Sequence, residues 1–504
     1  MNLYEIVEKN VSFHPGYKAV ICGDDGREFT WLQFDRMVDK VAGALRKMGV
    51  RKGDRVAIYL PNSPEFLFTF FAAAKIGAVV TPFNILYKTA EITYILNNAR
   101  SKVLVGLATE IEQNLISAGA HVPHLEKIVT VGNPVPGTID YSSLILSEDS
   151  ENLAPVDLSP DDLVAILYTS GTTGRPKGAM LSHGNFMANA ALNGSRVLHI
   201  NDQDMFLTAT PFCHIFFVLS VLGPFYAGAG VVTMQRFNPE NTLDLLSRYR
   251  VTHFAGVPTM YIFMLQQFKK GNGKWDLSAW RFAQSAGASM PAEHIKEIEQ
   301  QFGVGFCECY GATETSSTVT YGRLGHGKPG SVGPAAFGYE IRIAGETGEE
   351  LPAGEVGEIL VKGPGIFKGY WEMPEATKEA FYGEFYRTGD LGTRDEDGYI
   401  YIVDRKKDMI VCGGYNVYPR EVEEAIYQHP KVMEAAVLGV SDPVRGEVPK
   451  AFVRLKENEE MTDQELIDFL KQRMASYKVP RNIDFVAELP KSPTGKILKR
   501  KLQV

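Results

Sequence analysis

The chain has 504 residues, which is too long for one hydrophobic core and predicts three or four subdomains. Its net charge of −8 counts against a nucleic-acid binder, because such proteins present a basic face. The five cysteines are few, odd in number and scattered, which favours a reduced, cytoplasmic compartment over a disulfide-bonded secreted protein. The N-terminus also lacks the basic-then-apolar pattern of a signal peptide.

Strands and helices are predicted to alternate through the first four hundred residues. A helix is expected over 64–76, and strands are expected over 55–60, 78–82, 103–106, 127–131, 163–167 and 251–256. Such alternation is typical of mostly parallel sheets covered by helices. The segment from Met205 to Gln235 has no charged residue, but prolines and glycines interrupt it. It therefore predicts a buried helix and a strand over 231–234, and not a membrane span.

The pattern changes near residue 338. Short alternating strands, as in 339–343 and 358–361, predict a small β-rich subdomain over about 338–403. After Asp404 the chain returns to an α+β pattern, with helices expected over 419–429 and 462–474 and strands over 434–440 and 450–456. Residues 405–504 hold 18 Lys+Arg against 15 Asp+Glu, or +3, which leaves 34 against 45, or −11, for the rest. This mild basicity fits a solvated surface, or a cap that faces a phosphorylated substrate.

A Gly/Ser/Thr-rich loop follows the predicted strand over 163–167. Its sequence is Thr169-Ser170-Gly171-Thr172-Thr173-Gly174-Arg175-Pro176-Lys177-Gly178. Glycines let a backbone approach phosphate oxygens, hydroxyls donate hydrogen bonds, and cations offset the negative charge. The loop is not a Walker A motif, because Lys177 is followed by Gly178. We interpret it as a phosphate loop for ATP and not as a flexible linker, since linkers rarely follow a buried strand so directly.

Five further motifs accompany this loop along the chain. They are Pro211–His214, Cys309–Thr315, Tyr386–Asp390, Val403–Asp408 and Pro490–Ile497. With these motifs the chain resembles, over nearly its whole length, the adenylate-forming superfamily and within it the AMP-forming acyl-CoA synthetases of the fatty-acid–CoA ligase type. Firefly-type luciferases and the adenylation domains of peptide synthetases are other members. The resemblance implies an α/β fold with a large N-terminal domain over 1–403, made of two parallel-rich sheets with helices plus the β subdomain. It also implies a hinge over 404–407 and a small, mobile α+β cap over 408–504.

The resemblance further implies that a carboxylic acid is activated by ATP. A carboxylate is a poor acyl donor, so attack on the α-phosphate first makes an acyl-adenylate and releases pyrophosphate. The thiol of coenzyme A then displaces AMP to give a thioester. The first step crowds anionic oxygens together, which calls for Mg²⁺ and fixed positive groups.

Nucleotide-binding roles follow from the same resemblance. The β- and γ-phosphates would be held by Thr169, Ser170, Gly171, Thr172, Thr173, Gly174 and Lys177. The adenine would lie between Tyr310 and a wall formed by 285–289, which includes Gly287 and Ala288. Cys309, Gly311 and Ala312 belong to the same nucleotide-binding motif. Asp390 would accept the ribose hydroxyls, with Arg405 nearby.

Catalytic roles fall on four residues. Thr313 would contact the α-phosphate, and Glu314, with Thr169, would bind Mg²⁺. Lys496 would reach the substrate carboxylate and the α-phosphate, and His214 would stand at the acid pocket. Each has an ordinary alternative, since Glu314 could be a surface carboxylate and Lys496 one more cation of a basic tail.

The implied cap would rotate about Lys407 between the two half-reactions. Gly414 would then allow the pantetheine arm to pass. Coenzyme A is the expected acceptor, because no carrier domain follows Val504 and no condensation domain precedes Met1. An acyl-AMP ligase that loads an acyl carrier protein is the alternative, and a luciferase-like oxygenase and an inactive nucleotide sensor are others. Possible homodimerisation and peripheral membrane contact stay open.

The acid pocket is expected to be lined by 214–220, 287–288 and 315–320. The absence of a carboxylate from 215–219 counts against amino acids, whose ammonium group would need one. Phe216 and Phe217 could flank an alkyl chain or stack on an aryl ring. Small residues around Gly287 favour a medium- or long-chain fatty acid over a benzoate- or coumarate-type acid.

Overall fold

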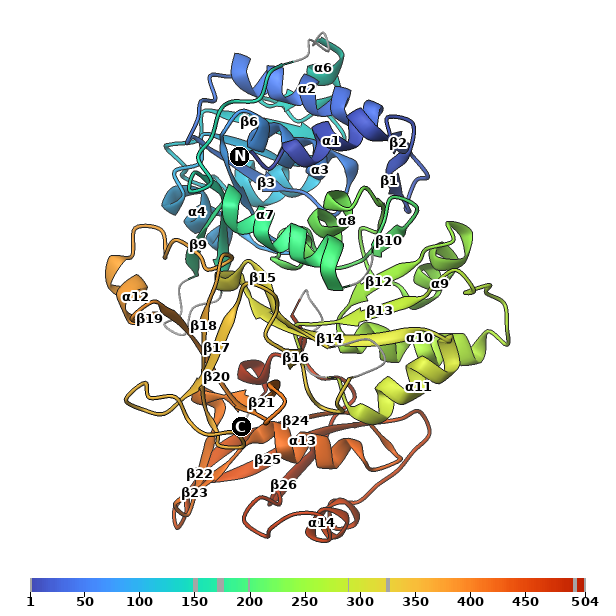
Figure 1. The fold of residues 1–504 in the computed structure, drawn as a ribbon, viewed down its shortest axis with the longest axis vertical. Coiled ribbons are helices and arrows are strands. Elements are labelled where there is room, and N and C mark those ends of the chain that lie inside the picture. The colour runs from blue at the N-terminus through green and yellow to red at the C-terminus, as the bar shows by residue number, and fades with distance from the viewer. Residues whose placement is uncertain are drawn as a thin grey trace.

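The protein is described by a computed structural model over residues 2–147, 153–169, 176–197, 200–288, 290–322, 327–492 and 496–502 (Figure 1). Within these ranges the strands form four sheets, with seven, eight, six and five members. Helices cover the two large sheets in the upper part of Figure 1, and the C-terminal sheet lies at the bottom as a separate small lobe. The predicted α/β fold class is confirmed.

The seven-stranded sheet carries the base of the predicted phosphate loop. Its order is β7 (Ile139–Asp140), β6 (Lys127–Val131), β5 (Val103–Leu107), β3 (Arg55–Tyr59), β4 (Val79–Pro82), β8 (Leu163–Thr169) and β9 (Lys177–Ser182). All neighbours pair in parallel except β8 and β9, which form an antiparallel hairpin at the edge. Its helices are α2 (Trp31–Lys47), α3 (Pro64–Lys75), α4 (Thr89–Asn98), α5 (Ala108–Ile111), η1 (Glu112–Ile116) and α6 (Tyr141–Ser147).

The eight-stranded sheet carries the predicted nucleotide motif on its last two strands. Its order is β15 (Ser317–Tyr321), β14 (Gly305–Ala312), β13 (Phe282–Ser285), β12 (His253–Gly256), β10 (Met205–Thr208), β11 (Gly230–Thr233), β1 (Lys18–Cys22) and β2 (Glu28–Thr30). Only the pairs at its two ends, β14–β15 and β1–β2, are antiparallel. The accompanying helices are α1 (Glu5–Phe13), α7 (His183–Ala191), η2 (Leu192–Val197), η3 (Val218–Leu222), α8 (Gly223–Tyr226), α9 (Pro239–Arg248), α10 (Pro258–Lys270), α11 (Ala292–Phe302) and η4 (Thr313–Thr315).

Two smaller sheets follow along the chain. The first contains β16 (Gly333–Pro334), β21 (Tyr399–Arg405), β20 (Phe385–Arg394), β18 (Gly357–Lys362), β17 (Glu340–Ala344) and β19 (Phe381–Tyr382), with α12 (Pro374–Glu379) beside it. The second, in the bottom lobe, contains β23 (Tyr415–Val417), β22 (Ile410–Cys412), β25 (Gly446–Leu455), β24 (Val432–Asp442) and β26 (Asn482–Phe485). It is joined by α13 (Pro419–Tyr427), α14 (Asp463–Lys471) and η6 (Lys499–Lys501), and η5 (Lys406–Asp408) connects the two sheets along the chain.

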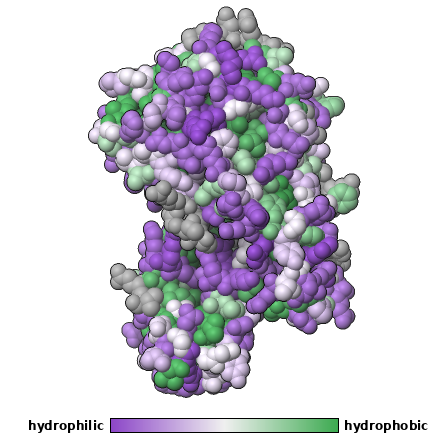
Figure 2. Space-filling model, turned by 90° about the vertical axis from the view of Figure 1, so that its left-hand side faces the viewer, coloured by the Kyte–Doolittle hydropathy of each residue, from purple (hydrophilic) through white to green (hydrophobic). Residues whose placement is uncertain are grey.

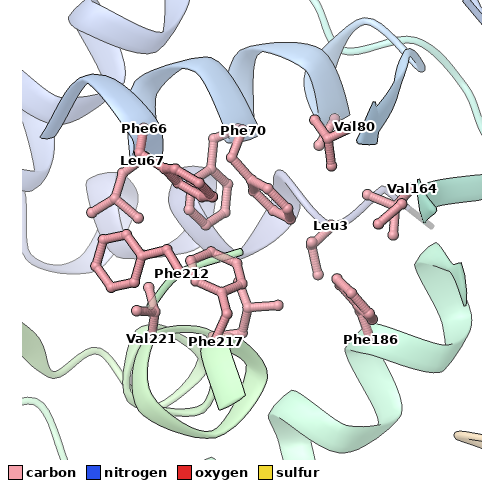
Figure 3. Close-up of a cluster of buried hydrophobic side chains, with 14 of the residues drawn as sticks. Leu3, Phe66, Leu67, Phe70, Val80, Val164, Phe186, Phe212, Phe217 and Val221 are labelled. Carbon is pink, nitrogen blue, oxygen red and sulfur yellow. The ribbon is translucent and has the colours of Figure 1, made fainter. Parts of the chain in front are cut away.

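Helix α3 lies at the centre of the largest hydrophobic core (Figure 3). Ser63 accepts a hydrogen bond from the backbone N–H of Phe66, and Pro64 occupies the first turn, so the sequence starts the helix sharply. The helix is apolar on every side, which is typical of a fully buried helix. Its Phe70 ring lies 4.7 Å from the Phe217 ring, centroid to centroid, and its Phe66 ring lies 5.4 Å from that of Phe212.

The segment 205–235 contains more secondary-structure elements than the sequence predicts. It contains the strand β10 before the expected helical part, which is η3 followed by α8, and the expected strand is β11. Among the described residues no helix is both long and apolar enough to cross a membrane.

The surface narrows between the upper lobes and the bottom lobe, and hydrophilic side chains predominate at the narrowing (Figure 2).

Candidate active site

The β8–β9 hairpin places the two ends of the predicted phosphate loop opposite each other. Thr169 and Lys177 are direct partners in the antiparallel register, and both are half-buried. The loop residues predicted between them, Ser170, Gly171, Thr172, Thr173 and Gly174, lie outside the described residues. The ammonium of Lys177 lies 5.0 Å from the centroid of the Tyr370 ring, so the loop base adjoins that tyrosine.

Tyr370 connects the loop base to Glu314. Its hydroxyl donates a hydrogen bond of 2.9 Å to Oε1 of Glu314. Glu314 lies on η4 directly after β14 and is 8% exposed, which rules out an ordinary surface carboxylate. Burial raises the pKa of this carboxyl above its usual value. A buried carboxylate with one donor keeps acceptor capacity for a further ligand. Thr313, the preceding residue, remains partly exposed.

Asp390 joins the nucleotide motif to the β-rich sheet. The Tyr310 hydroxyl donates a hydrogen bond of 2.7 Å to Oδ2 of Asp390, and Nε of Arg405 lies 3.3 Å from its Oδ1. Asp390 and Arg405 are register partners on β20 and β21, which explains why residues of two separate motifs meet. Both carboxylate oxygens therefore point into one polar cluster beside Tyr310.

Lys496 is brought to the same cluster from the far end of the chain. The Lys496 side chain is exposed to solvent, but neighbouring protein atoms partly desolvate its ammonium. This desolvation, reinforced by the nearby positive charge of Arg405, lowers the pKa of Lys496 to about 8, while Asp390 and Asp408 act in the opposite direction. The structure thus brings Lys496 into electrostatic range of Arg405 and Asp390, which lie about ninety and one hundred residues earlier in the chain.

The predicted adenine wall follows β13 and is anchored by a residue that sequence reasoning missed. Gly287 adopts a left-handed φ of 83°, and it and Ala288 are exposed. The backbone N–H of Met290 donates a hydrogen bond of 3.0 Å to Oε1 of Glu308, which is 7% exposed. Burial raises the pKa of Glu308 to about 7. The only signal in the sequence was a lone acid between Cys307 and Cys309 in an apolar strand.

The remaining residues of the nucleotide motif divide between surface and core. Gly311 is exposed, and a Cβ there would lie 1.7 Å from the carbonyl oxygen of Ser317, so a side chain cannot be accommodated. Ala312 is half-buried at the end of β14. Cys309 was predicted among the nucleotide-binding residues, but its thiol is buried and lies 3.6 Å from the Ser285 carbonyl oxygen as a hydrogen-bond donor. Its side chain is therefore part of the core.

The predicted acid pocket is only partly open. Nε2 of His214 is buried and has no hydrogen-bond partner among the described residues, and desolvation lowers the pKa of this imidazole to about 4. The neighbouring Ile215 and Phe216 are half-buried. Phe217 corrects our expectation, because its ring is 3% exposed and packs into the core against α3 instead of facing a substrate (Figure 3).

Gly414 is not brought to this cluster. It lies exposed in the turn between β22 and β23 with a φ of 84°, and these two strands belong to the bottom lobe (Figure 1). Lys407 lies on η5, between the β-rich sheet and that lobe.

Comparison with known proteins agrees with this arrangement. A model of the AMP-binding enzyme family matches residues 7–371, and a model of the AMP-binding enzyme C-terminal domain matches residues 421–496. A long-chain-fatty-acid–CoA ligase of Bacillus subtilis (strain 168) is 36% identical over 506 residues, which cover 95% of this chain and 90% of that ligase. A feruloyl-CoA synthase of Amycolatopsis sp is 37% identical over 481 residues, which cover 94% of this chain and 93% of that synthase.

A solved structure also shares this fold. The anthranilate CoA ligase AuaEII in complex with anthranoyl-AMP matches with a TM-score of 0.93 and 33% identity, over 99% of this chain and 95% of that one. The present chain therefore belongs to the AMP-binding enzyme family, within the adenylate-forming superfamily, and is an AMP-forming acid–thiol ligase.

Proposed function

We propose that the cluster around Glu314, Asp390 and Lys496 forms an acyl-adenylate from ATP and a carboxylic acid. The observation that carries this proposal is the convergence of these three residues from separate motifs onto one polar site. The phosphate loop between Thr169 and Lys177 would hold the β- and γ-phosphates. Tyr310 and the 285–289 segment would enclose the adenine, and Asp390 with Arg405 would receive the ribose.

The residues present fit a magnesium ion. Glu314 offers a buried carboxylate, and the Thr169 hydroxyl stands at the start of the phosphate loop that Lys177 closes. Mg²⁺ would neutralise phosphate charge when bound. The protein's own contribution is to hold Glu314 through Tyr370, away from competing water.

In the first half-reaction a carboxylate oxygen of the acid attacks the α-phosphorus, and the bond from that phosphorus to the pyrophosphate oxygen breaks. Negative charge grows on the α-phosphate oxygens as this happens. Lys496 would stabilise this charge as an ammonium, with Thr313 donating from the other side. His214, which desolvation keeps neutral, would orient the acid without adding charge to the pocket.

In the second half-reaction the thiol of coenzyme A attacks the acyl carbon, and AMP leaves. We propose that the cap over 408–504 rotates on the hinge 404–407, about Lys407, relative to the domain over 1–403. Gly414 would then reach the site and leave room for the pantetheine arm. Gly414 is exposed in the present orientation, which supports this proposal. The bottom lobe would have to turn for Gly414 to face the site that Lys496 now faces.

For the acid we propose an aryl carboxylic acid of the benzoate or coumarate type. The correction at Phe217 leaves Phe216 as the one phenylalanine of the pair that remains partly open, and one ring face suits a flat substrate as well as an alkyl chain. The anthranilate ligase and the feruloyl-CoA synthase support this choice. A medium- or long-chain fatty acid is the second candidate, which the similarity to the Bacillus long-chain-fatty-acid–CoA ligase favours.

The test is pyrophosphate release with ATP and Mg²⁺ across an acid panel, with and without coenzyme A. The panel runs from acetate to palmitate and includes benzoate, anthranilate, coumarate, ferulate and several amino acids. CoA-dependent turnover with an aryl acid is expected, and turnover with palmitate alone would favour the second candidate. Turnover that requires acyl carrier protein in place of coenzyme A would overturn the acceptor assignment.

A further inference from the structure

We propose that Asn189 on α7 is a positioning residue for Glu314, which it controls through the backbone of the turn that follows. The inference rests on the proposed function in one respect, the role of Glu314 toward Mg²⁺. Asn189 itself touches neither ATP nor the acid in this proposal. Its effect is to hold the chain of residues 315–317 in a shape that this sequence would not adopt alone.

The turn after Glu314 is strained. Ser316 and Ser317 have φ values of 56° and 102°, and both lie in the region that disfavours residues with a side chain. Two consecutive non-glycine residues in this region persist only where the surroundings hold them, and such strain is concentrated at functional sites. The position of Glu314, two residues upstream, therefore depends on what restrains the turn.

Asn189 supplies one of the buried restraints on this turn. Its Nδ2 donates hydrogen bonds to the carbonyl oxygen of Thr315, at 3.0 Å, and to the hydroxyl oxygen of Tyr339, at 2.7 Å. Asn189 is completely buried, so water cannot take over these hydrogen bonds when its side chain is removed. The Thr315 carbonyl oxygen belongs to the peptide that directly precedes Ser316.

A loop of the β-rich sheet braces the turn from the other side. The Ser316 hydroxyl donates to the carbonyl oxygen of Gly365 at 2.7 Å, and the backbone N–H of Phe367 donates to the carbonyl oxygen of Glu314 at 2.8 Å. A Cβ at Gly365 would lie 2.3 Å from Nδ2 of Asn189 and 2.7 Å from the Thr315 carbonyl oxygen. The loop can approach this closely only because residue 365 is a glycine.

Helix α7 also binds the loop 364–367 directly. Nδ2 of Asn185, one turn before Asn189, donates to the carbonyl oxygens of Pro364 and Ile366 at 2.7 and 3.0 Å. Helix α7, the loop 364–367 and the turn 315–317 thus form a closed set of hydrogen bonds around Glu314's backbone. Loss of the Asn189 amide removes the hydrogen bond to the Thr315 carbonyl oxygen, which lies next to the strained residues.

Asn193 provides a matched control. It lies one helical turn beyond Asn189 and is equally buried. Its Nδ2 donates to the Asn189 carbonyl oxygen at 2.7 Å, and its Oδ1 accepts from the Thr318 hydroxyl at 3.1 Å. Among the described residues its side chain makes no hydrogen bond to 313–317, so its replacement removes two buried hydrogen bonds without releasing the turn.

The experiment compares Asn189→Ala and Asn193→Ala in the full chain by ATP–pyrophosphate exchange over a series of Mg²⁺ concentrations. We expect Asn189→Ala to raise the Mg²⁺ concentration for half-maximal exchange by about tenfold or more, as loss of a residue behind a metal ligand generally does. The KM for the acid should change little. Asn193→Ala should leave the Mg²⁺ requirement within about twofold of the original protein at a comparable loss of Tm.

Further variants separate the possible failures. Glu314→Gln tests the proposed function, since an unchanged Mg²⁺ requirement in that variant would remove the metal role itself. If Glu314→Gln raises the requirement while Asn189→Ala does not, the positioning role alone is overturned. Equal shifts in Asn189→Ala and Asn193→Ala would also overturn it, because they would reflect general destabilisation. Should Asn189→Ala fail to fold, Asn189→Ser carries the same expectation with a smaller cavity.

Discussion

The backbone N–H of Arg420 donates a hydrogen bond of 2.8 Å to Oδ2 of Asp404, so the first residue of the proposed hinge is joined directly to helix α13 of the bottom lobe. Arg420 is in the first turn of α13, and Asp404 is near the end of β21. The Arg420 guanidinium also donates to the carbonyl oxygen of Ile402 and pairs with Glu424 at 3.0 Å. These contacts hold the bottom lobe in the orientation in which Lys496 lies near Asp390.

Replacement of Asp404 should therefore act on one half-reaction. Asp404→Ala removes a buried acceptor that serves the N-terminus of α13, and we expect adenylation to slow by about fivefold, the equivalent of about 1 kcal/mol. Thioester formation from preformed acyl-AMP should keep its rate, because in the proposed mechanism that step uses another lobe orientation. Single-turnover assays of each half-reaction provide the measurement. Glu424→Ala, which removes an exposed partner of Arg420, is the control, and an equal loss of both half-reactions in Asp404→Ala would contradict the prediction.

Lys496→Ala should abolish adenylation but retain conversion of preformed acyl-AMP to thioester. The reason is that only the first step develops charge beside the Lys496 ammonium in the present orientation. Pyrophosphate exchange measures the first step, and AMP release from synthetic acyl-AMP with coenzyme A measures the second. Equal loss of both steps would show that Lys496 serves the fold or the thiol step as well.

The pH dependence of adenylation should report the same lysine. Desolvation lowers the pKa of Lys496 to about 8, so the ammonium is present below that pH and is lost as the pH rises through it. We expect kcat/KM for ATP, which reports ionisations of the free enzyme, to fall about tenfold per pH unit well above pH 8. Lys496→Arg should have lower activity without this fall, since arginine stays charged. A wild-type profile that is flat to pH 10 would contradict the assignment.

Glu308 should make the stability of the fold pH-dependent. Its pKa is raised from 4.5 to about 7 by burial, so its favourable contribution is complete below pH 4.5 and is lost as the pH rises through 7. Glu308→Gln keeps the acceptor for the Met290 N–H and removes the titration. The free energy of unfolding of this variant, relative to wild type, should increase by about 3 kcal/mol between pH 4.5 and pH 8, since one pKa unit corresponds to about 1.4 kcal/mol. Denaturant unfolding at several pH values tests this, and a constant difference would count against it.

Alanine variants of Phe216 and Phe217 should have different effects, one on substrate binding and the other on stability. Phe217→Ala removes a buried ring beside α3, and we expect a loss of stability of about 3–5 kcal/mol. Phe216→Ala should change the KM for the acid several-fold while the Tm shifts little, because that ring is only half-buried. Acid KM values and thermal unfolding of both variants provide the measurement. A reversed outcome would place Phe217 in the pocket.

Local sequence patterns predicted most helices and strands of the fold. Helix α3, for example, begins at a serine cap and a proline and ends one residue before the expected position. The side-chain orientations around η3 could not be predicted in this way. Every position from 215 to 219 is apolar, so periodicity cannot show which ring faces the core. That is why Phe216 and Phe217 were not distinguished.

The candidate site shows a similar division. The resemblance of their motifs to those of a known family identified Glu314, Asp390 and Arg405. The contact of Glu314 with Tyr370 depends on a long-range packing arrangement that no local spacing encodes. The same holds for Asn189, which lies 126 residues before the carbonyl group that it holds.

The environment of two cysteines near the site bears on the fate of the intermediate. An acyl-adenylate acylates any accessible thiolate, and Cys213 and Cys309 are sequence neighbours of His214 and Tyr310. Burial raises the pKa of Cys213 to about 12 and that of Cys309 well above its usual value, so both remain protonated at neutral pH. A neutral thiol is a poor nucleophile, so we expect neither cysteine to compete with the external thiol for the activated acyl group.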